Sequence, residues 1–339
     1  NTFDKKVQIN AGTVSITASR NLGADPSGSY ANKLTLNGGT LQVNATFVLN
    51  TNYNTTVGAG NGWLEVTDGY TLTHGAPISG AGALGKTGSG TLLLVHDSTF
   101  SGRMTNSAGT VQIGNNGSAG SITADIENNA ALVWHWTTAT EYLGTISGTG
   151  TLTKLGDSSL WLRGTNTYSG DTTVSEGTLV VRGSASNSSV GVASGAALMG
   201  NGPVSNLTVS GTMDPGNGTT LPGNLHCAAL TLNAGGAMHV DVSAATGTAG
   251  TGWDTITASG AIAANATGTF TLNLYGTPAD FHSATGYSWK IMDGASVSDF
   301  DAGRFAVNTD NFTPDLDGGS FSVSQSGSDL YLNFVPRTP

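Results

Sequence analysis

One short stretch of the chain carries the three side-chain types of a nucleophilic site. His226 and Cys227 are adjacent, and Asp241 follows in a later apolar-polar alternation. A thiol becomes a nucleophile when an imidazole takes its proton and a carboxylate orients the ring. Neighbouring residues of a strand point to opposite faces, so the imidazole of His226 and the thiol of Cys227 are not expected to meet. The sequence therefore predicts no catalytic residue, and Cys227 is interpreted as a small buried apolar residue.

Two indoles, Trp134 and Trp136, flank His135 and would share one face of a strand. Aromatic rings stack on sugars, so a glycan contact is one interpretation. The other is that both rings pack into the core or into a subunit contact, since large aromatic side chains dominate buried and interface area. The packing interpretation is favoured.

Three acids near a Gly-Gly turn, Asp310, Asp315 and Asp317, offer oxygens that could bind calcium. Their spacing departs from the twelve-residue calcium loop, and the bidentate acid near its end is absent. An acidic turn is the favoured interpretation. A lone cysteine cannot build a thiolate zinc site, so no metal and no cofactor is expected.

The elements that must position these residues are short strands. Alternating apolar and polar residues recur at 6–10, 33–37, 63–67 and 238–242, with Gly and Asn pairs between them. Such alternation turns the apolar side chains inward, and the glycines permit the positive φ angles of sharp corners. No helical period persists, so the chain is predicted to be all-β. Because 37% of the residues are hydrophobic and follow this pattern, disorder is rejected despite 50 glycines.

A long internal repeat organises these strands. Residues 78–113 and 146–181 align without a gap at an offset of 68 positions. The shared positions are turn glycines, apolar residues and one lysine: Gly80/Gly148, Leu84/Leu152, Lys86/Lys154, Gly88/Gly156 and Leu92/Leu160. A repeat of this kind indicates a solenoid. The offset divides into about three coils of roughly 20–25 residues, which predicts a right-handed parallel β-helix whose coils stack the two copies.

Charge and apolar runs exclude two classes of partner. The chain has a net charge of −10 and only 12 basic residues, spread thinly, so no patch is predicted to bind nucleic acid. No run approaches the ~20 apolar residues of a membrane-spanning helix. The chain starts at Asn1 without a signal-like run, and this predicts a mature chain after signal removal that is secreted, extracellular or at the cell surface.

The second copy resembles the autotransporter-associated β-strand repeat. The resemblance rests on the Gly148-x-Gly150-x-Leu152-x-Lys154-x-Gly156 pattern, on 164–170 (GTNTYSG) and on 176–181 (EGTLVV). Downstream, 211–217 (GTMDPGN) is similar to the segment that usually follows this repeat. The resemblance implies a bacterial, secreted, passenger-like β-helix that is part of a larger surface protein. It implies no reaction, because the repeat carries no catalytic residue.

Two regions are predicted. Residues 1–224 would form a β-helix with both repeats, and 225–339 would continue it or cap it, since aromatic residues become frequent after Pro222. The predicted function is structural and not enzymatic: a self-associating scaffold, adhesin stalk or filament subunit. The alternative is a carbohydrate-binding or carbohydrate-cleaving β-helix, with surface glycans as its partner.

Self-association is predicted at open strand edges, which can pair with another copy. A homopolymer would form by end-to-end strand addition. The residues assigned to this contact lie in the first and last alternating segments: Val7, Ile9, Val14, Ile16, Tyr331 and Phe334.

Overall fold

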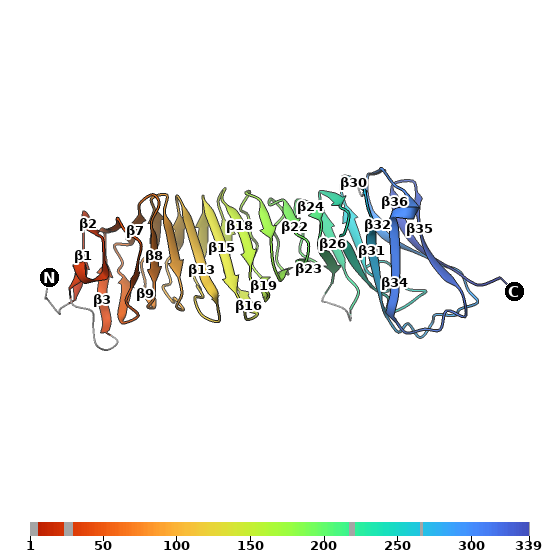
Figure 1. The fold of residues 1–339 in the computed structure, drawn as a ribbon, viewed down its shortest axis with the longest axis horizontal. Helices are drawn as coiled ribbons and strands as arrows, with labels where there is room; N and C mark the ends of the chain where they lie inside the picture. The colour runs from red at the N-terminus through yellow and green to blue at the C-terminus, as the bar shows by residue number, and fades with distance from the viewer. Residues whose placement is uncertain (1–5, 24–29, 217–220, 265–266, 339) are drawn as a thin grey trace. The chain divides into compact units, whose positions relative to one another are not determined.

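The computed structural model describes residues 6–23, 30–216, 221–264 and 267–338. The chain divides into two compact units, the first ending at Asp171 and the second beginning at Thr172. Among the described residues there is no α-helix, only the short 3₁₀ turns η1 (Ser19–Leu22) and η2 (Ala302–Arg304). All other regular elements are strands (Figure 1). The predicted all-β class is confirmed.

The first unit winds its strands around three faces. Face 1 contains β1 (Val7–Ile9), β3 (Tyr30–Leu36), β6 (Tyr53–Val57) and β9 (Ile78–Gly80), then an isolated bridge from Ser98 to Ile122, then β16 (Thr140–Tyr142) and β19 (Ser159–Leu162). Face 2 contains β2 (Thr13–Ile16), β4 (Thr40–Val43), β7 (Gly62–Val66), β10 (Leu84–Thr87), β12 (Met104–Asn106), β14 (Ile126–Asn128) and β17 (Ile146–Ser147). Face 3 contains β5 (Phe47–Leu49), β8 (Thr71–His74), β11 (Thr91–Leu94), β13 (Thr110–Gly117), β15 (Ala131–Trp136) and β18 (Thr151–Leu155).

Every pairing within these faces is parallel and joins strands of successive coils, where a coil is one passage of the chain over the three faces. The buried residues of one coil therefore lie directly over those of the next. On face 3 the residues that stack in one column are Leu72, Leu92, Val111, Leu132 and Leu152. All five are fully buried. This arrangement is the predicted parallel β-helix.

The two repeat copies lie on different faces, and this corrects the expected stacking. Leu84 belongs to face 2, where its column continues through Met104 and Ile126 to Ile146. Its repeat counterpart, Leu152, lies on face 3 above Leu132. One coil advances the chain by about 20 residues, at the short end of the expected range. The offset of 68 positions therefore equals three coils and one further face.

Shared glycines make the corners between faces. Gly80 and Gly148 have φ angles of 116° and 100°, in the region that favours glycine. A Cβ at Gly80 would lie 2.1 Å from the Val57 carbonyl oxygen, and one at Gly148 would lie 2.2 Å from that of Asn128. The repeat therefore keeps glycine where the backbone of one coil turns directly against the coil before it.

The second unit has two parallel rows of strands and a mixed sheet. The β20 row contains β20 (Thr172–Val174), β22 (Val190–Val192), β24 (Asn206–Val209), β27 (Ala229–Leu232), β30 (Ala261–Ala263) and β33 (Ser296–Ser298). The β21 row contains β21 (Thr178–Val181), β23 (Ala197–Gly200), β25 (Thr212–Pro215), β28 (Ala237–Asp241), β31 (Phe270–Gly276) and β34 (Phe305–Phe312). The five-stranded sheet contains β26 (Asn224–Cys227), β29 (Thr255–Ala258), β32 (Tyr287–Asp293), β36 (Asp329–Val335) and β35 (Ser320–Ser326).

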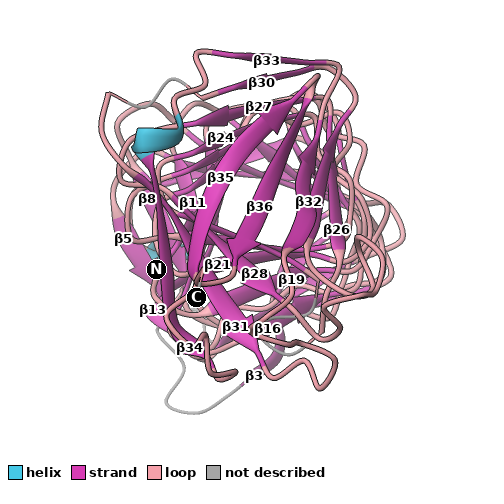
Figure 2. Cartoon of the chain, turned by 90° about the vertical axis from the view of Figure 1, so that its right-hand side faces the viewer, coloured by secondary structure: helices cyan, strands magenta, loops and turns pink. Residues whose placement is uncertain are grey.

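The last two strands of the five-stranded sheet leave the parallel pattern. β36 pairs antiparallel with both β32 and β35 (Figure 2). Beneath them the side chains of Phe281, Tyr287, Phe312 and Phe334 are in contact, with ring centroids 4.9 Å apart for Phe281 and Phe334 and 5.2 Å for Phe281 and Phe312. These large rings pack against one another beside the antiparallel strands, and that this region caps the β-helix stays a prediction. The predicted boundary at 224/225 falls within β26 and stays a prediction.

Candidate functional site

The paired tryptophans lie inside the first unit. Trp134 is 1% exposed and Trp136 is 6% exposed. The Trp134 ring lies against Tyr142 at a centroid distance of 5.1 Å, and Trp136 lies over Gly114. The structure therefore favours the packing interpretation, since neither indole offers a face on which a sugar ring could stack.

Among the described residues the candidate nucleophile is not hydrogen-bonded to a base. His226 is exposed and Cys227 is buried, on opposite faces of β26 as the alternation predicts. Burial raises the pKa of the Cys227 thiol to about 12, which keeps it protonated. Asp241 lies elsewhere, in the carboxylate cluster described below. Within the described residues no histidine ring is hydrogen-bonded to a serine or a cysteine.

The three acids that were weighed as a calcium site do not converge on one point. Asp310, Asp315 and Asp317 are all exposed. Asp315 accepts a hydrogen bond from the backbone N–H of Asp317 at 2.9 Å, which closes a local turn. They are not among the acids that converge within ligand distance in the described part of the chain. This geometry is that of the favoured acidic turn.

The residues assigned to self-association differ in exposure. Ile9, Ile16 and Phe334 are buried, Val7 and Tyr331 are half-buried, and Val14 is 38% exposed. β1 and β2 are terminal strands of their sheets, so this edge is open among the described residues. β36, which carries Tyr331 and Phe334, lies between β32 and β35 and is not an edge.

Three carboxylates that are distant in the sequence converge inside the second unit. Asp214 lies in β25, Asp241 ends the neighbouring strand β28, and Asp254 directly precedes β29. Each contributes one oxygen, and these oxygens all lie within 4.8 Å of one another. The three residues are 0%, 3% and 0% exposed. We call this group the carboxylate cluster.

Hydrogen bonds fix two members of the carboxylate cluster. Asp254 accepts from the backbone N–H of Gly223 at 2.6 Å through Oδ1 and from that of Asp241 at 2.8 Å through Oδ2. Asp214 Oδ2 lies 3.2 Å from Nδ1 of His239, whose ring packs on Tyr275. Asp214 Oδ1 and both oxygens of Asp241 have no hydrogen-bond partner. Three buried carboxylate oxygens are thus left unsatisfied, which is rare in proteins.

Burial shapes the charge state of the cluster. Burial raises the pKa of Asp254 to about 9, against the hydrogen bonds from Gly223 and Asp241. Burial, helped by the negative charge of Asp214, raises the pKa of Asp241 to about 7; His239 and the nearby Leu221 backbone oppose this shift. Within the described residues the only ion pair to the cluster is that of His239 with Asp214. At neutral pH protons therefore neutralise Asp254 and part of Asp241, so that the cluster holds less than three negative charges unless a cation replaces those protons.

The sequence held part of the signal for this cluster. Asp214 lies in the 211–217 motif, whose Asn217 is outside the described residues, and Asp241 was considered with His226 and Cys227. Asp254 was missed, because nothing local distinguishes it from a surface acid. Their meeting depends on the pairing of β25 with β28 and on the return of the chain to β29.

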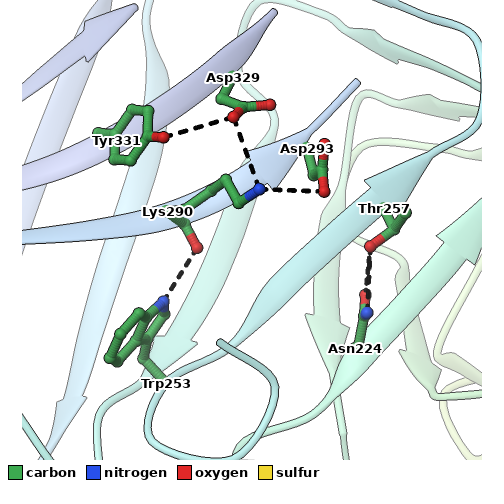
Figure 3. Close-up of polar contacts among 7 residues, drawn as sticks. All are labelled: Asn224, Trp253, Thr257, Lys290, Asp293, Asp329 and Tyr331. Atoms are coloured by element: carbon green, nitrogen blue, oxygen red, sulfur yellow. Dashed lines mark hydrogen bonds and ion pairs between the residues drawn. The ribbon is translucent and has the colours of Figure 1, made fainter. Parts of the chain in front are cut away.

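The outer side of the five-stranded sheet carries a small charged network (Figure 3). Lys290 Nζ lies 3.1 Å from Asp293 and 3.5 Å from Asp329, and Tyr331 donates to Asp329 at 3.3 Å. Trp253 Nε1 donates to the carbonyl of Lys290 at 2.9 Å. The charged groups are partly exposed, so the network contributes little to stability and leaves its charges solvated.

An exposed aromatic ring marks a shallow pocket on face 2. Trp63 is 36% exposed and covers Gly85 of the next coil. Asn61, Thr105 and Ser107 line the same pocket with polar side chains. An indole beside hydroxyl and amide groups can contact a sugar. Nothing in the sequence around Trp63 distinguishes it from a buried strand residue.

Comparison with known proteins identifies the repeat. Residues 84–113 and 152–181 both match the family described as passenger-associated-transport-repeat. These matches fall within the two copies found in the sequence. The predicted resemblance to autotransporter passengers is therefore confirmed: the chain contains two repeats of the passenger-associated type.

Two relatives share parts of the chain. The chain is 37% identical over 182 residues to an adhesin, the BmaC autotransporter of Brucella suis biovar 1 (strain 1330). It is 45% identical over 83 residues to an extracellular serine protease of Serratia marcescens. The matches cover 54% and 24% of this chain but only 5% and 8% of the relatives. The chain thus corresponds to a small part of each of them. None of its described helical turns has the length and apolarity needed to cross a membrane.

Proposed function

We propose that the chain is a β-helical passenger segment of an exported, cell-surface adhesin-like protein, and that its role is mechanical rather than catalytic. The observation that carries this proposal is what the two repeats conserve between them. Their shared residues build the coil: corner glycines such as Gly80 and Gly148, and buried leucines such as Leu84 and Leu152. Such positions hold a shape and perform no reaction.

The shared lysine supports the same interpretation. Lys86 is fully buried, and its Nζ donates to the carbonyls of Gly88 at 2.7 Å and Ala108 at 2.9 Å. Lys154, its counterpart, donates to the carbonyl of Gly156 at 2.6 Å. In both copies the ammonium group satisfies backbone oxygens at a corner of the coil. This is a structural use of lysine.

A coil deletion tests the mechanical role. Because Leu84 stacks on Met104, deletion of residues 84–103 removes one whole coil and joins matching positions. Deletion of residues 84–93 removes half a coil and misaligns every later strand. With the chain displayed on a bacterial surface, we expect the first variant to remain folded and to support cell adherence, and the second to be degraded. Hydrolysis of peptide or polysaccharide substrates by the purified chain would contradict the proposal.

We further propose that the chain self-associates, and the open strand edge formed by β1 and β2 supports this. β1 and β2 end their sheets, and Val14 exposes an apolar side chain there. Unpaired strand edges add further strands unless a charge blocks them. Light scattering of the purified chain across a concentration series should show oligomers that the Val14→Lys variant lacks. A wild-type chain that stays monomeric at high concentration would contradict self-association.

Carbohydrate binding is the second candidate function, and the pocket beside Trp63 supports it. A glycan array should then show saturable binding that the Trp63→Ala variant loses. The Trp134→Phe variant is the matched control, because its ring is buried. Equal binding by wild type and Trp63→Ala would exclude this pocket as the glycan site.

A further inference from the structure

We propose that Asp214, Asp241 and Asp254 bind one divalent cation, calcium, and that this ion ties together the coils of the second unit in which they lie. The site is independent of the proposed function, since it uses none of the repeat residues.

The geometry fits a single ion. One oxygen from each carboxylate lies within 4.8 Å of the others. Calcium–oxygen distances are 2.3–2.6 Å, so two oxygens bound to one ion lie at most about 5 Å apart. The three carboxylates come from β25, from β28 and from the residue before β29, so a shared ion would join three segments of the chain.

The unsatisfied oxygens are the independent sign of a ligand. Asp241 is only 3% exposed, and although the Leu221 backbone lies near its carboxylate and favours the charged form, neither oxygen has a partner at normal hydrogen-bond geometry. Asp214 Oδ1 is likewise unpartnered, while His239 holds its other oxygen. Each oxygen of Asp254 accepts one backbone N–H and keeps a second lone pair. Buried carboxylates without partners are costly, and a cation is a partner that suits all three.

The donor set selects the ion. All converging ligands are carboxylate oxygens, which suit hard cations, whereas zinc and copper prefer nitrogen and sulfur. Asp241 offers both oxygens, as a bidentate calcium ligand does. Magnesium is smaller and usually keeps several waters, which a site with at most 3% exposure disfavours. Calcium is therefore the expected occupant.

The test compares calcium with chelator on the full chain. The protein is unfolded in urea with a chelator, refolded with calcium, magnesium or neither, and dialysed to equilibrium against buffer that contains the same ion at about 1 mM, above the dissociation constant expected for a tight extracellular site. We expect elemental analysis to find about one calcium per chain in excess of the dialysis buffer. Calcium at about 10 mM, some 100-fold above the tighter end of the range for extracellular modules, should raise the Tm by about 5–10 °C, and magnesium should not.

Two variants locate the ion. Asp241→Asn keeps the shape of the side chain and should abolish both calcium binding and the Tm shift. Asp97→Asn is the matched control, because Asp97 also accepts backbone N–H groups but is exposed and lies outside the carboxylate cluster. If Asp97→Asn loses calcium as well, the assignment is wrong. If Asp241→Asn does not fold, wild-type calcium binding decides: no bound calcium and no Tm shift would overturn the proposal and leave the carboxylates neutralised by protons.

Discussion

Leu152 stacks directly on Leu132 in the column of Leu92, although its counterpart in the repeat is Leu84. The two copies of the repeat therefore share their local structure but not their face of the β-helix. What the repeat conserves is the succession of strand, corner and strand. Which face each strand occupies is set by the number of residues that precede it.

Pairwise coupling between leucines tests this arrangement. Leu132→Ala and Leu152→Ala should each lower the free energy of unfolding by about 2–5 kcal/mol, because both side chains are fully buried. The two substitutions should couple by about 0.5–3 kcal/mol, since the side chains share one cavity. Urea unfolding of the single and double variants measures the coupling.

The pair Leu84→Ala and Leu152→Ala is the control for that cycle. These residues lie on different faces, so their effects should add to within about 0.5 kcal/mol. Strong coupling between them would mean that the repeat copies stack after all.

Substitution of a corner glycine tests why glycine is needed there: close contact with the backbone of the preceding coil, or only the conformational freedom of glycine. Gly80→Ala should destabilise the first unit by at least about 2 kcal/mol, because a Cβ there meets the Val57 carbonyl at 2.1 Å with φ at 116°. Gly191→Ala is the control, since nothing lies within 4 Å of its Cβ position, and it should be neutral or stabilising by up to about 1 kcal/mol. Thermal unfolding compares the two, and equal losses would refute the close-contact explanation.

His74 should make the first unit sensitive to acid. Its Nδ1–H donates to the carbonyl of Ala76 at 2.8 Å, and its Nε2 lies 2.9 Å from the hydroxyl of Thr55, so the buried ring is neutral. Burial, with a further contribution from the charge of His96, lowers the pKa of His74 from 6.5 to about 4. The unfolded chain therefore binds a proton at a higher pH than the folded chain does.

The sign of the effect follows from that difference. As the pH falls from about 6.5 to 4, the free energy of unfolding should drop by about 3 kcal/mol through His74 alone. Urea unfolding at several pH values should show a shallower slope for His74→Asn than for wild type. His282→Gln, which replaces an exposed histidine, should leave the slope unchanged. Identical slopes for wild type and His74→Asn would exclude this origin.

Trp134 should prove important for stability and not for ligand binding. Trp134→Ala should lower the free energy of unfolding by about 3–5 kcal/mol, because it leaves a cavity beside Tyr142. Trp134→Phe should cost much less, since it keeps an aromatic ring and removes a buried N–H that has no partner. Chemical unfolding measures the effect on stability, and a glycan array measures the effect on binding. Specific loss of glycan binding in the folded Trp134→Phe variant would contradict the packing role.

The sequence was sufficient for the class of fold, because the signals were local and repeated. Alternation around residues such as Leu64 and Leu92 predicts strands, and glycines such as Gly80 predict corners. The face of each strand was not predictable, since an error of one or two residues in the coil length accumulates over three coils. The antiparallel β35 and β36 were also missed, because alternation reads the same in both directions.

The carboxylate cluster could not be found from the sequence for a related reason. Asp214, Asp241 and Asp254 meet only because strands of successive coils pair and because Asp254 is hydrogen-bonded to the backbone of Gly223. Locally each is a single acid among polar residues. The candidates that did stand out, such as Trp134 and Cys227, were unusual by type and proved to be buried.

Because the second copy of the repeat lies one face further round the β-helix than the first, the number of copies determines the direction in which later strands face. A duplication of one 68-residue unit would lengthen the helix by three coils and also rotate everything after it by a third of a revolution. Three duplications would restore the original azimuth. Gain or loss of one such unit during evolution would therefore change the orientation of the segments that follow the repeat without changing any residue in those segments.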